Sequence, residues 1–191
     1  MPFTHIDLIG LNKHEMFDAP IVGNNDELVA LATASKDAKQ SMSTAGMRHS
    51  QGGHTALTDG RMVFTEAMKM DIHVDVKKMT VRVNAGATWS DLHFRLGPMG
   101  LAPLVHQSSP HFSIGGSLSV DCHGREVHEG ALSNTVESIT VLTNQNNELK
   151  YTVASRELGE NPMLFYAALG GYGACGVILD ATPRKQQIAC L

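Results

Sequence analysis

The chain has 191 residues, of which 42% are hydrophobic and 18% are charged, and its formal net charge is −4. This composition is ordinary for a globular protein, and the length suits one domain or two small lobes. No basic run accompanies the acidic balance, which argues against a nucleic-acid partner. A small anionic ligand stays open, because backbone N–H groups can bind one without lysine or arginine.

The cysteines and the N-terminal sequence bear on the cellular compartment. Cys122, Cys175 and Cys190 are odd in number and widely spaced, so they form neither a disulfide framework nor a zinc pattern. The first ten residues contain no apolar run of signal-peptide length, and no segment has the apolar length of a membrane span. We therefore expect a cytoplasmic protein with free thiols and no membrane span.

The first part of the chain predicts an extended segment, a helix, a strand and a glycine-rich loop, in that order. Asn25, Asp26 and Glu27 are typical of a helix start, and apolar residues follow them as far as Ala34. Farther on, apolar and polar residues alternate at 72–76, which is the period of a half-buried strand. The expected extended segments are 19–23, 41–45, 61–65, 70–76, 80–85, 101–105, 136–143, 148–153 and 177–182, with a hairpin turn at 144–147.

Two further helices have start signals of their own. Thr88 stands in N-cap position with Asp91 three residues later, a capping box in which Asp replaces the usual Glu or Gln. That helix is expected to stop at 97–98, and Asn161 followed by Pro162 begins the next one. Because helices and strands mix without strict alternation, the predicted fold class is α+β, with mixed and antiparallel sheets.

Three glycine-rich segments, at 46–53, 113–124 and 170–176, adjoin apolar sequence of strand type. Glycine has no Cβ, so the main-chain N–H groups of such segments can approach a pyrophosphate or a flavin ring. One segment would indicate only a tight turn, but three favour a large, flat, anionic cofactor. No G-x-G-x-x-G opens a helix after the first strand and no Walker sequence occurs, which argues against those two nucleotide sites.

Two other kinds of site have weaker support. His49 and His54 are five residues apart, as are His106 and His111, but neither H-E-x-x-H nor H-x-H occurs, so no metal site is predicted. Ser50 follows His49, yet adjacent side chains in a loop point in different directions and no G-x-S-x-G elbow exists. A hydrolase triad is therefore not predicted either.

The three glycine-rich segments resemble those of a known family. Residues 43–53 (STAGMRHSQGG) resemble the pyrophosphate loop of FAD-binding domains of the vanillyl-alcohol oxidase and p-cresol methylhydroxylase (PCMH) type. Residues 113–119, closed by His123 and Gly124, resemble the family's second flavin-contacting stretch, and 161–178 resemble its third signature. The segments occur in the family's order and at about its spacing.

The resemblance implies two α+β subdomains, at about 19–85 and 86–183, with a tail at 184–191 and FAD between the subdomains. The first segment would cradle the pyrophosphate through N–H groups, the second would border the flavin and its ribityl chain, and the third would lie at the adenine end. The implied cofactor-binding residues are Gly46, Met47, Arg48, His49, Ser50, Gln51, Gly115, Gly116, Ser117, Ser119, His123, Gly124, Gly173, Gly176 and Ile178.

His49 stands where many family members attach the flavin C8-methyl group to a histidine nitrogen, so the resemblance implies covalent FAD at this residue. The alternative is a His49 that only hydrogen-bonds within its loop. Some members add a second link through a cysteine just before a proline. Here Ser109 precedes Pro110, so no second link is expected.

Family enzymes usually continue into a further domain that covers the flavin and supplies the substrate contacts and the catalytic base. No such part is recognised here, so substrate, electron acceptor and catalytic residues are not assigned. Three functions stay open: a truncated form or subunit of an FAD oxidoreductase, a flavin-binding protein without turnover, and a degenerate scaffold that acts through protein contacts. Apolar surface left without its cap domain predicts a homo-oligomer or a partner chain.

Overall fold

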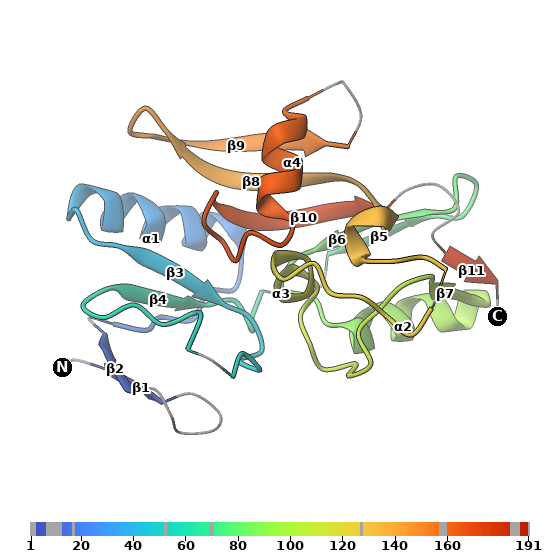
Figure 1. Ribbon diagram of the computed structural model, residues 1–191, viewed down its shortest axis with the longest axis horizontal. Coiled ribbons are helices and arrows are strands. Elements are labelled where there is room, and N and C mark those ends of the chain that lie inside the picture. Colours follow the sequence, from blue (N-terminus) through green and yellow to red (C-terminus); the bar gives the residue numbers. More distant parts are fainter. Residues whose placement is uncertain are drawn as a thin grey trace. The chain divides into compact units, whose positions relative to one another are not determined.

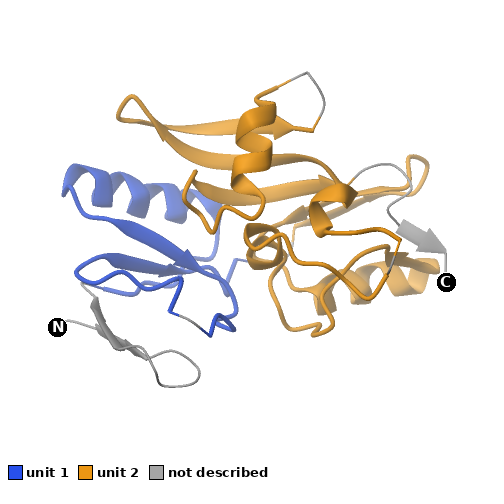
Figure 2. Ribbon diagram, in the orientation of Figure 1, with its two compact units in different colours: residues 1–69 blue, residues 70–191 orange. Residues whose placement is uncertain are grey.

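The computed structural model describes residues 18–51, 53–68, 71–126, 128–156 and 160–183, together with the backbone of short strands at 3–6, 13–16 and 188–190. The chain forms two compact units, residues 1–69 and 70–191 (Figure 2). Both contain helix and strand, so the fold is a mixed α and β one. The sequence-based boundary near residue 85 lies later than this division, because the strands at 72–75 and 80–84 join the sheet of the second unit.

In the first unit, the described residues from 18 onward form one helix and a pair of parallel strands (Figure 1). The helix begins as the sequence predicts, because Asn24 Oδ1 accepts the N–H of Glu27 at 2.9 Å and Glu27 Oε2 accepts the N–H of Gly23 at 2.7 Å. An N-terminal hairpin, which the sequence did not predict, precedes them. The elements are β1 (Phe3–Ile6), β2 (Lys13–Met16), α1 (Asn25–Asp37), β3 (Met42–Ala45) and β4 (Arg61–Phe64).

The second unit is built on a five-stranded antiparallel sheet with the strand order β5-β6-β10-β8-β9. The last of these strands in the sequence, β10, is the central one: Asp180 pairs with Asn84 of β6 and Ile178 pairs with Val141 of β8. The predicted hairpin forms between β8 and β9. The strands are β5 (Ile72–Asp75), β6 (Thr80–Asn84), β8 (Val136–Gln145), β9 (Glu148–Ser155) and β10 (Val177–Pro183).

The helices of the second unit pack on this sheet around one core, to which Trp89, Leu96 and Phe165 contribute. The predicted capping box is present, since Asp91 N–H donates to Thr88 Oγ1 and Thr88 N–H donates to Asp91 Oδ2. The elements are α2 (Trp89–Leu96), η1 (Gly97–Met99), β7 (Leu101–Pro103), α3 (Ile114–Ser119), η2 (Leu132–Thr135) and α4 (Pro162–Ala168).

Three details differ from the sequence-based expectation. Asn161 precedes α4 but caps nothing, because its side-chain amide donates to the C=O of Val153 at 3.0 Å. The glycine-rich segment after residue 112 contains the unpredicted helix α3. Of the expected tail, 184–187 and 191 lie outside the described residues, while β11 (Ile188–Cys190) pairs with β7. No helix among the described residues has the length and apolar character needed to cross a membrane.

Candidate functional site

The first glycine-rich segment, 46–51, leaves the carboxyl end of β3 in the first unit. Arg48 has a φ of +58°, a left-handed conformation that turns the backbone sharply. Its guanidinium is 2.8 Å from the carboxylate of Glu66 and lies over the ring of Phe64, 5.0 Å from the ring centroid. Because the charge of Arg48 is paired with that of Glu66, an anion at this loop would depend on other donors as well, among them the backbone N–H groups.

Several N–H groups of the same loop are available to a ligand. Among the described residues, no backbone hydrogen bond has its donor at Gly46, Met47 or Gln51. His49 is exposed, and Ser50 Oγ lies 3.0 Å from Nδ1 of His54. N–H groups in a glycine-rich turn after a strand are suited to phosphate oxygens. The loop therefore offers backbone donors of the kind that bind phosphate oxygens.

The two consecutive glycines of α3 have different surroundings. The N–H of Gly115 donates to the C=O of Ala85 at 2.8 Å, and a Cβ at Gly115 would lie 2.7 Å from the Cβ of Ala85. Packing within the unit thus requires glycine at 115. Gly116 is exposed, and among the described residues a Cβ there would meet only Ser113 Oγ. Its outer side is open to a ligand.

The two serines of α3 also differ. Ser117 is 3% exposed, and its hydroxyl accepts the indole N–H of Trp89 at 2.9 Å and donates to the C=O of Ser113 at 2.9 Å. Its only proton is therefore used inside the unit. Ser119 is half-buried, and its C=O accepts the N–H of Tyr172 at 2.9 Å.

The third glycine-rich segment, 170–176, lies directly against α3. Besides the bond from Tyr172 to Ser119, the N–H of Gly170 donates to the C=O of Leu118 at 3.1 Å. Segments that are about fifty residues apart in the sequence are therefore side by side in the second unit.

Within this third segment, the glycines again fall into two kinds. Gly173 has a φ of +80° and is exposed. Among the described residues, a Cβ added at Gly173 would contact only the C=O of Gly176, at 4.0 Å. Gly176 has a φ of +129°, and a Cβ there would overlap the C=O of Leu142 and lie 2.9 Å from Val141 Cγ1. Ile178 is buried in β10. Only Gly173 of these three offers an open surface.

The end of the second segment returns to the same region. His123 is exposed, with Nδ1 2.9 Å from the C=O of Gly124. A Cβ at Gly124 would overlap Glu126 Oε2 and lie 3.1 Å from the C=O of His106. Glu126 Oε2 is buried and has no hydrogen-bond partner among the described residues. Next to His123, the N–H of Cys122 donates to the C=O of Ser117 at 3.0 Å, which joins this stretch to α3.

Within the second unit, the structure thus brings together 115–119, 122–124 and 170–173. The loop 46–51 belongs to the first unit. Two residues that support this region, Trp89 and Asp121, had no functional motif in the sequence to mark them. The carboxylate of Asp121 accepts the N–H and the hydroxyl of Ser133 at 2.7 and 2.8 Å. A lone tryptophan directly after a helix cap was the available signal for Trp89.

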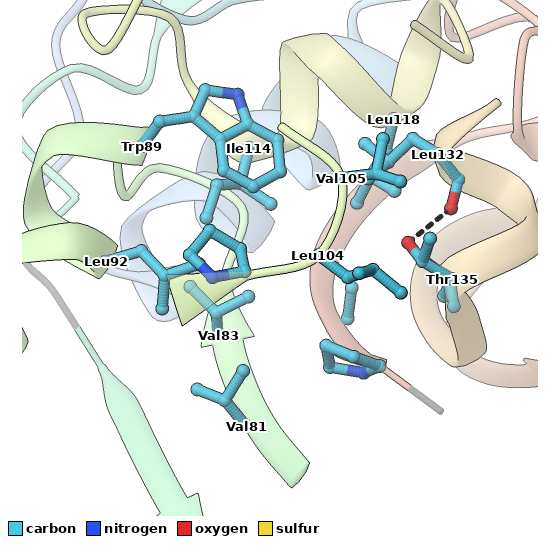
Figure 3. Close-up of a pocket in the computed structure, with 14 residues that line it drawn as sticks. Val81, Val83, Trp89, Leu92, Leu104, Val105, Ile114, Leu118, Leu132 and Thr135 are labelled. Carbon is cyan, nitrogen blue, oxygen red and sulfur yellow. Dashed lines mark hydrogen bonds between the residues drawn. The ribbon is translucent and has the colours of Figure 1, made fainter. Parts of the chain in front are cut away.

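An apolar pocket lies elsewhere in the second unit, between α2, α3 and the sheet (Figure 3). Trp89, Leu92, Val105 and Leu118 are among the side chains that line it, and Thr135 Oγ1 donates to the C=O of Leu132 at 2.7 Å. This lining offers no charged group to a phosphate. Among the described residues, no three His, Cys, Asp or Glu side chains gather as metal ligands would.

Most of the chain, including two of the three glycine-rich segments, matches a known family. Residues 21–151 match the family model described as "FAD binding domain", which is more than half of the chain. The class defined by this match is that of flavin-adenine-dinucleotide-binding domains. The chain belongs to the PCMH-type FAD-binding-domain family, which confirms the resemblance found in its glycine-rich segments.

Curated relatives include oxidases and dehydrogenases. The chain is 27% identical over 185 residues to decaprenylphosphoryl-beta-D-ribose oxidase of Mycolicibacterium smegmatis, which covers 95% of this chain and 39% of the relative. It is 31% identical over 147 residues to cytokinin dehydrogenase 2 of Arabidopsis thaliana (73% and 28%). It is 30% identical over 169 residues to L-gulonolactone oxidase of Mus musculus (88% and 36%). The chain therefore spans well under half the length of these relatives.

Proposed function

We propose that this chain is the FAD-binding part of a flavin-dependent oxidoreductase that oxidises a small-molecule substrate by hydride transfer to FAD. The observation that carries the proposal is the family match at 21–151, which includes two of the three glycine-rich segments. FAD supplies the electron acceptor for such a reaction. This chain's own residues bind and orient it.

The roles proposed for the residues follow their surroundings. The N–H groups of the loop 46–51 bind the pyrophosphate. This role is supported by Gly46, Met47 and Gln51, whose N–H groups donate to no backbone oxygen among the described residues. Gly116 and Gly173 offer open backbone to the cofactor, while Gly115, Gly176 and Ile178 hold the loops in place. We keep the division of the chain into two subdomains as part of the proposal, with the boundary at residues 69–70 that the two compact units have.

The proposal assigns no substrate-binding residue and no catalytic base to the described residues. Because the relatives are much longer, the proposal places the substrate contacts in a further domain or on a partner chain. The alternative is a flavin-binding protein without turnover or a degenerate scaffold. The relatives' names include a cytokinin dehydrogenase, an L-gulonolactone oxidase and an alditol oxidase, so oxidation of a cytokinin, a lactone and an alditol should be assayed first.

The first experiment is the intact mass of the purified protein under denaturing conditions, with its visible spectrum. A yellow protein that carries the added mass of one FAD supports both the cofactor and a covalent link. A yellow protein of bare mass retains the cofactor and overturns the link. A colourless protein that stays colourless with added FAD overturns the proposal and leaves the scaffold alternative.

The covalent link is proposed at His49, and His49→Ala tests it. The variant is expected to lose the added mass while still binding FAD reversibly. His73→Ala, which removes an exposed histidine of β5, is the matched control and should keep the added mass. If His49→Ala retains covalent FAD, another residue forms the link.

A further inference from the structure

The helix α3 needs support from outside itself. It has six residues, and two of them are consecutive glycines. Helices this short do not form in isolation, and glycine is among the poorest helix formers. The contacts that fix α3 therefore fix the backbone of Gly116, which the proposed function assigns to the cofactor.

A buried chain of hydrogen bonds begins at Trp89 and ends at Gly116. The indole N–H of Trp89 donates to Ser117 Oγ at 2.9 Å, and the Ser117 hydroxyl donates to the C=O of Ser113 at 2.9 Å. Ser113 Oγ in turn accepts the N–H of Gly116 at 3.3 Å. Trp89, Ser117 and Ser113 are 3%, 3% and 5% exposed, so water does not compete for the first two bonds. The third bond, from the exposed Gly116, is partly buried.

The backbone around Trp89 is fastened to the same segment. The N–H of Ser90 donates to the C=O of Pro110 at 2.8 Å, and the N–H of Trp89 donates to the C=O of Phe112 at 3.2 Å. The N–H of Ile114 donates to the C=O of Ala87 at 2.8 Å. The indole ring therefore has a fixed position relative to α3, and its N–H sets where the Ser117 hydroxyl can point.

We infer that Trp89 is a positioning residue for FAD, which acts through Ser117 to hold Gly115 and Gly116 in the conformation that the cofactor meets. Ser117 has the same role and does not contact the cofactor with its side chain, because its hydroxyl proton is already donated to Ser113. The inference rests on the proposed function. It gives Ser117, which the sequence places among the cofactor contacts, an indirect task.

The test compares FAD affinity of the 191-residue chain with that of Trp89→Phe, which keeps an aromatic ring but removes the N–H. FAD binding is measured by titration of flavin fluorescence, with the visible circular dichroism of the bound flavin as a second readout. Loss of one buried hydrogen bond predicts a dissociation constant about three- to tenfold higher and an altered flavin dichroism. For a covalently loaded protein, the dichroism alone decides.

The control is Leu96→Val, which removes a buried methylene from the far end of α2 without touching the hydrogen-bond chain. It should lower the melting temperature and leave the FAD readouts of the folded protein unchanged. In a Ser117→Ala background, Trp89→Phe should cause no further loss, because the acceptor is already gone. If Trp89→Phe does not fold, Ser117→Ala alone decides, with the same expected loss of affinity.

The outcomes separate the inference from the proposed function. A wild-type chain that binds no FAD overturns both. A wild-type chain that binds FAD, with Trp89→Phe and Ser117→Ala changed in melting temperature only, overturns the inference alone and leaves Trp89 a core residue.

Discussion

The imidazole rings of His93 and His106 meet edge to face, with their centroids 4.7 Å apart. Burial lowers the pKa of His93 below its ordinary value of 6.5, and the neighbouring His106 lowers that pKa further. The two elements next to α2 along the chain, η1 and β7, pack against it and contain no titratable residue. Both effects favour the neutral ring of His93. The partly buried Glu126, near the C=O of His106, and the exposed Arg125 are charged side chains of the same unit.

The folded protein should become less stable as the pH falls below about 6.5, the ordinary histidine value. A lowered pKa of His93 in the folded state means that the unfolded chain binds more protons in that range, so stability rises with pH. Denaturant unfolding at pH 7.5 and pH 5.5 measures the effect. His93→Gln should flatten this dependence, whereas His111→Gln, at an exposed histidine, should not.

Gly176→Ala should destabilise the second unit by about 3 kcal/mol or more, through backbone strain and overlap together. The φ of +129° is unsuited to an L side chain, and the added Cβ would overlap the C=O of Leu142. Gly97→Ala is the matched control, because a Cβ there has nothing within 4 Å and the φ is −53°. Equal unfolding midpoints in urea for the two variants would contradict this prediction.

Arg82→Ala should cost about 1.5–3 kcal/mol of unfolding free energy, because it removes a charged hydrogen bond. Arg82 Nη2 lies 2.8 Å from Asp180 Oδ2, and that bond raises the pKa of the Arg82 guanidinium. Without it, the Thr140 hydroxyl, at 3.1 Å, is the remaining side-chain partner of the nearly buried Asp180 carboxylate among the described residues. Lys150→Ala, which breaks an exposed pair with Glu148, should cost less than about 1 kcal/mol.

Of the two described cysteines, only Cys175 should react quickly with a thiol reagent at pH 8. Burial raises the pKa of the Cys122 thiol to about 11, and the thiolate is the reactive form. Cys175 is exposed. In a Cys190→Ser background, colorimetric titration should give one fast thiol, and the second only after unfolding; Cys175→Ser should abolish the fast phase. Fast modification of Cys122 in the folded protein would show that this site opens.

Local signals in the sequence predicted the starts of α1 and α2, because a capping side chain acts within four residues of the helix start. Thr88 with Asp91 is such a pair. For α1 the sequence predicted the start at 25–27 but not the residue that caps it, Asn24. The helix α3 was missed, because its stability depends on Trp89 and Ala85, which lie far outside it in the sequence. Judged by helix propensity alone, residues 114–119, with two consecutive glycines, would not be expected to form a helix.

The glycine-rich segments were correctly found, but the reason for each glycine was not readable from the sequence. Gly115 and Gly176 are required by Ala85 and Leu142, neighbours that only the folded chain brings close. Among the described residues, a Cβ at Gly116 would approach only Ser113 Oγ, at 2.9 Å, and one at Gly173 only the C=O of Gly176, at 4.0 Å. A glycine motif therefore identifies the family, while the structure separates the glycines that pack from those with room for a ligand.

The central place of β10 in its sheet has a consequence for synthesis of the protein. β6 and β8 precede β10 in the sequence, so they leave the ribosome before the strand that joins them. The pairing of Asp180 with Asn84 therefore spans most of the second unit. Contacts so distant in sequence form slowly. Until residues 177–183 emerge, both strands present open edges of the kind that chaperones cover and aggregates recruit. A nascent chain that ends before Val177 would thus contain two separate strand pairs, β5 with β6 and β8 with β9, and not the five-stranded sheet.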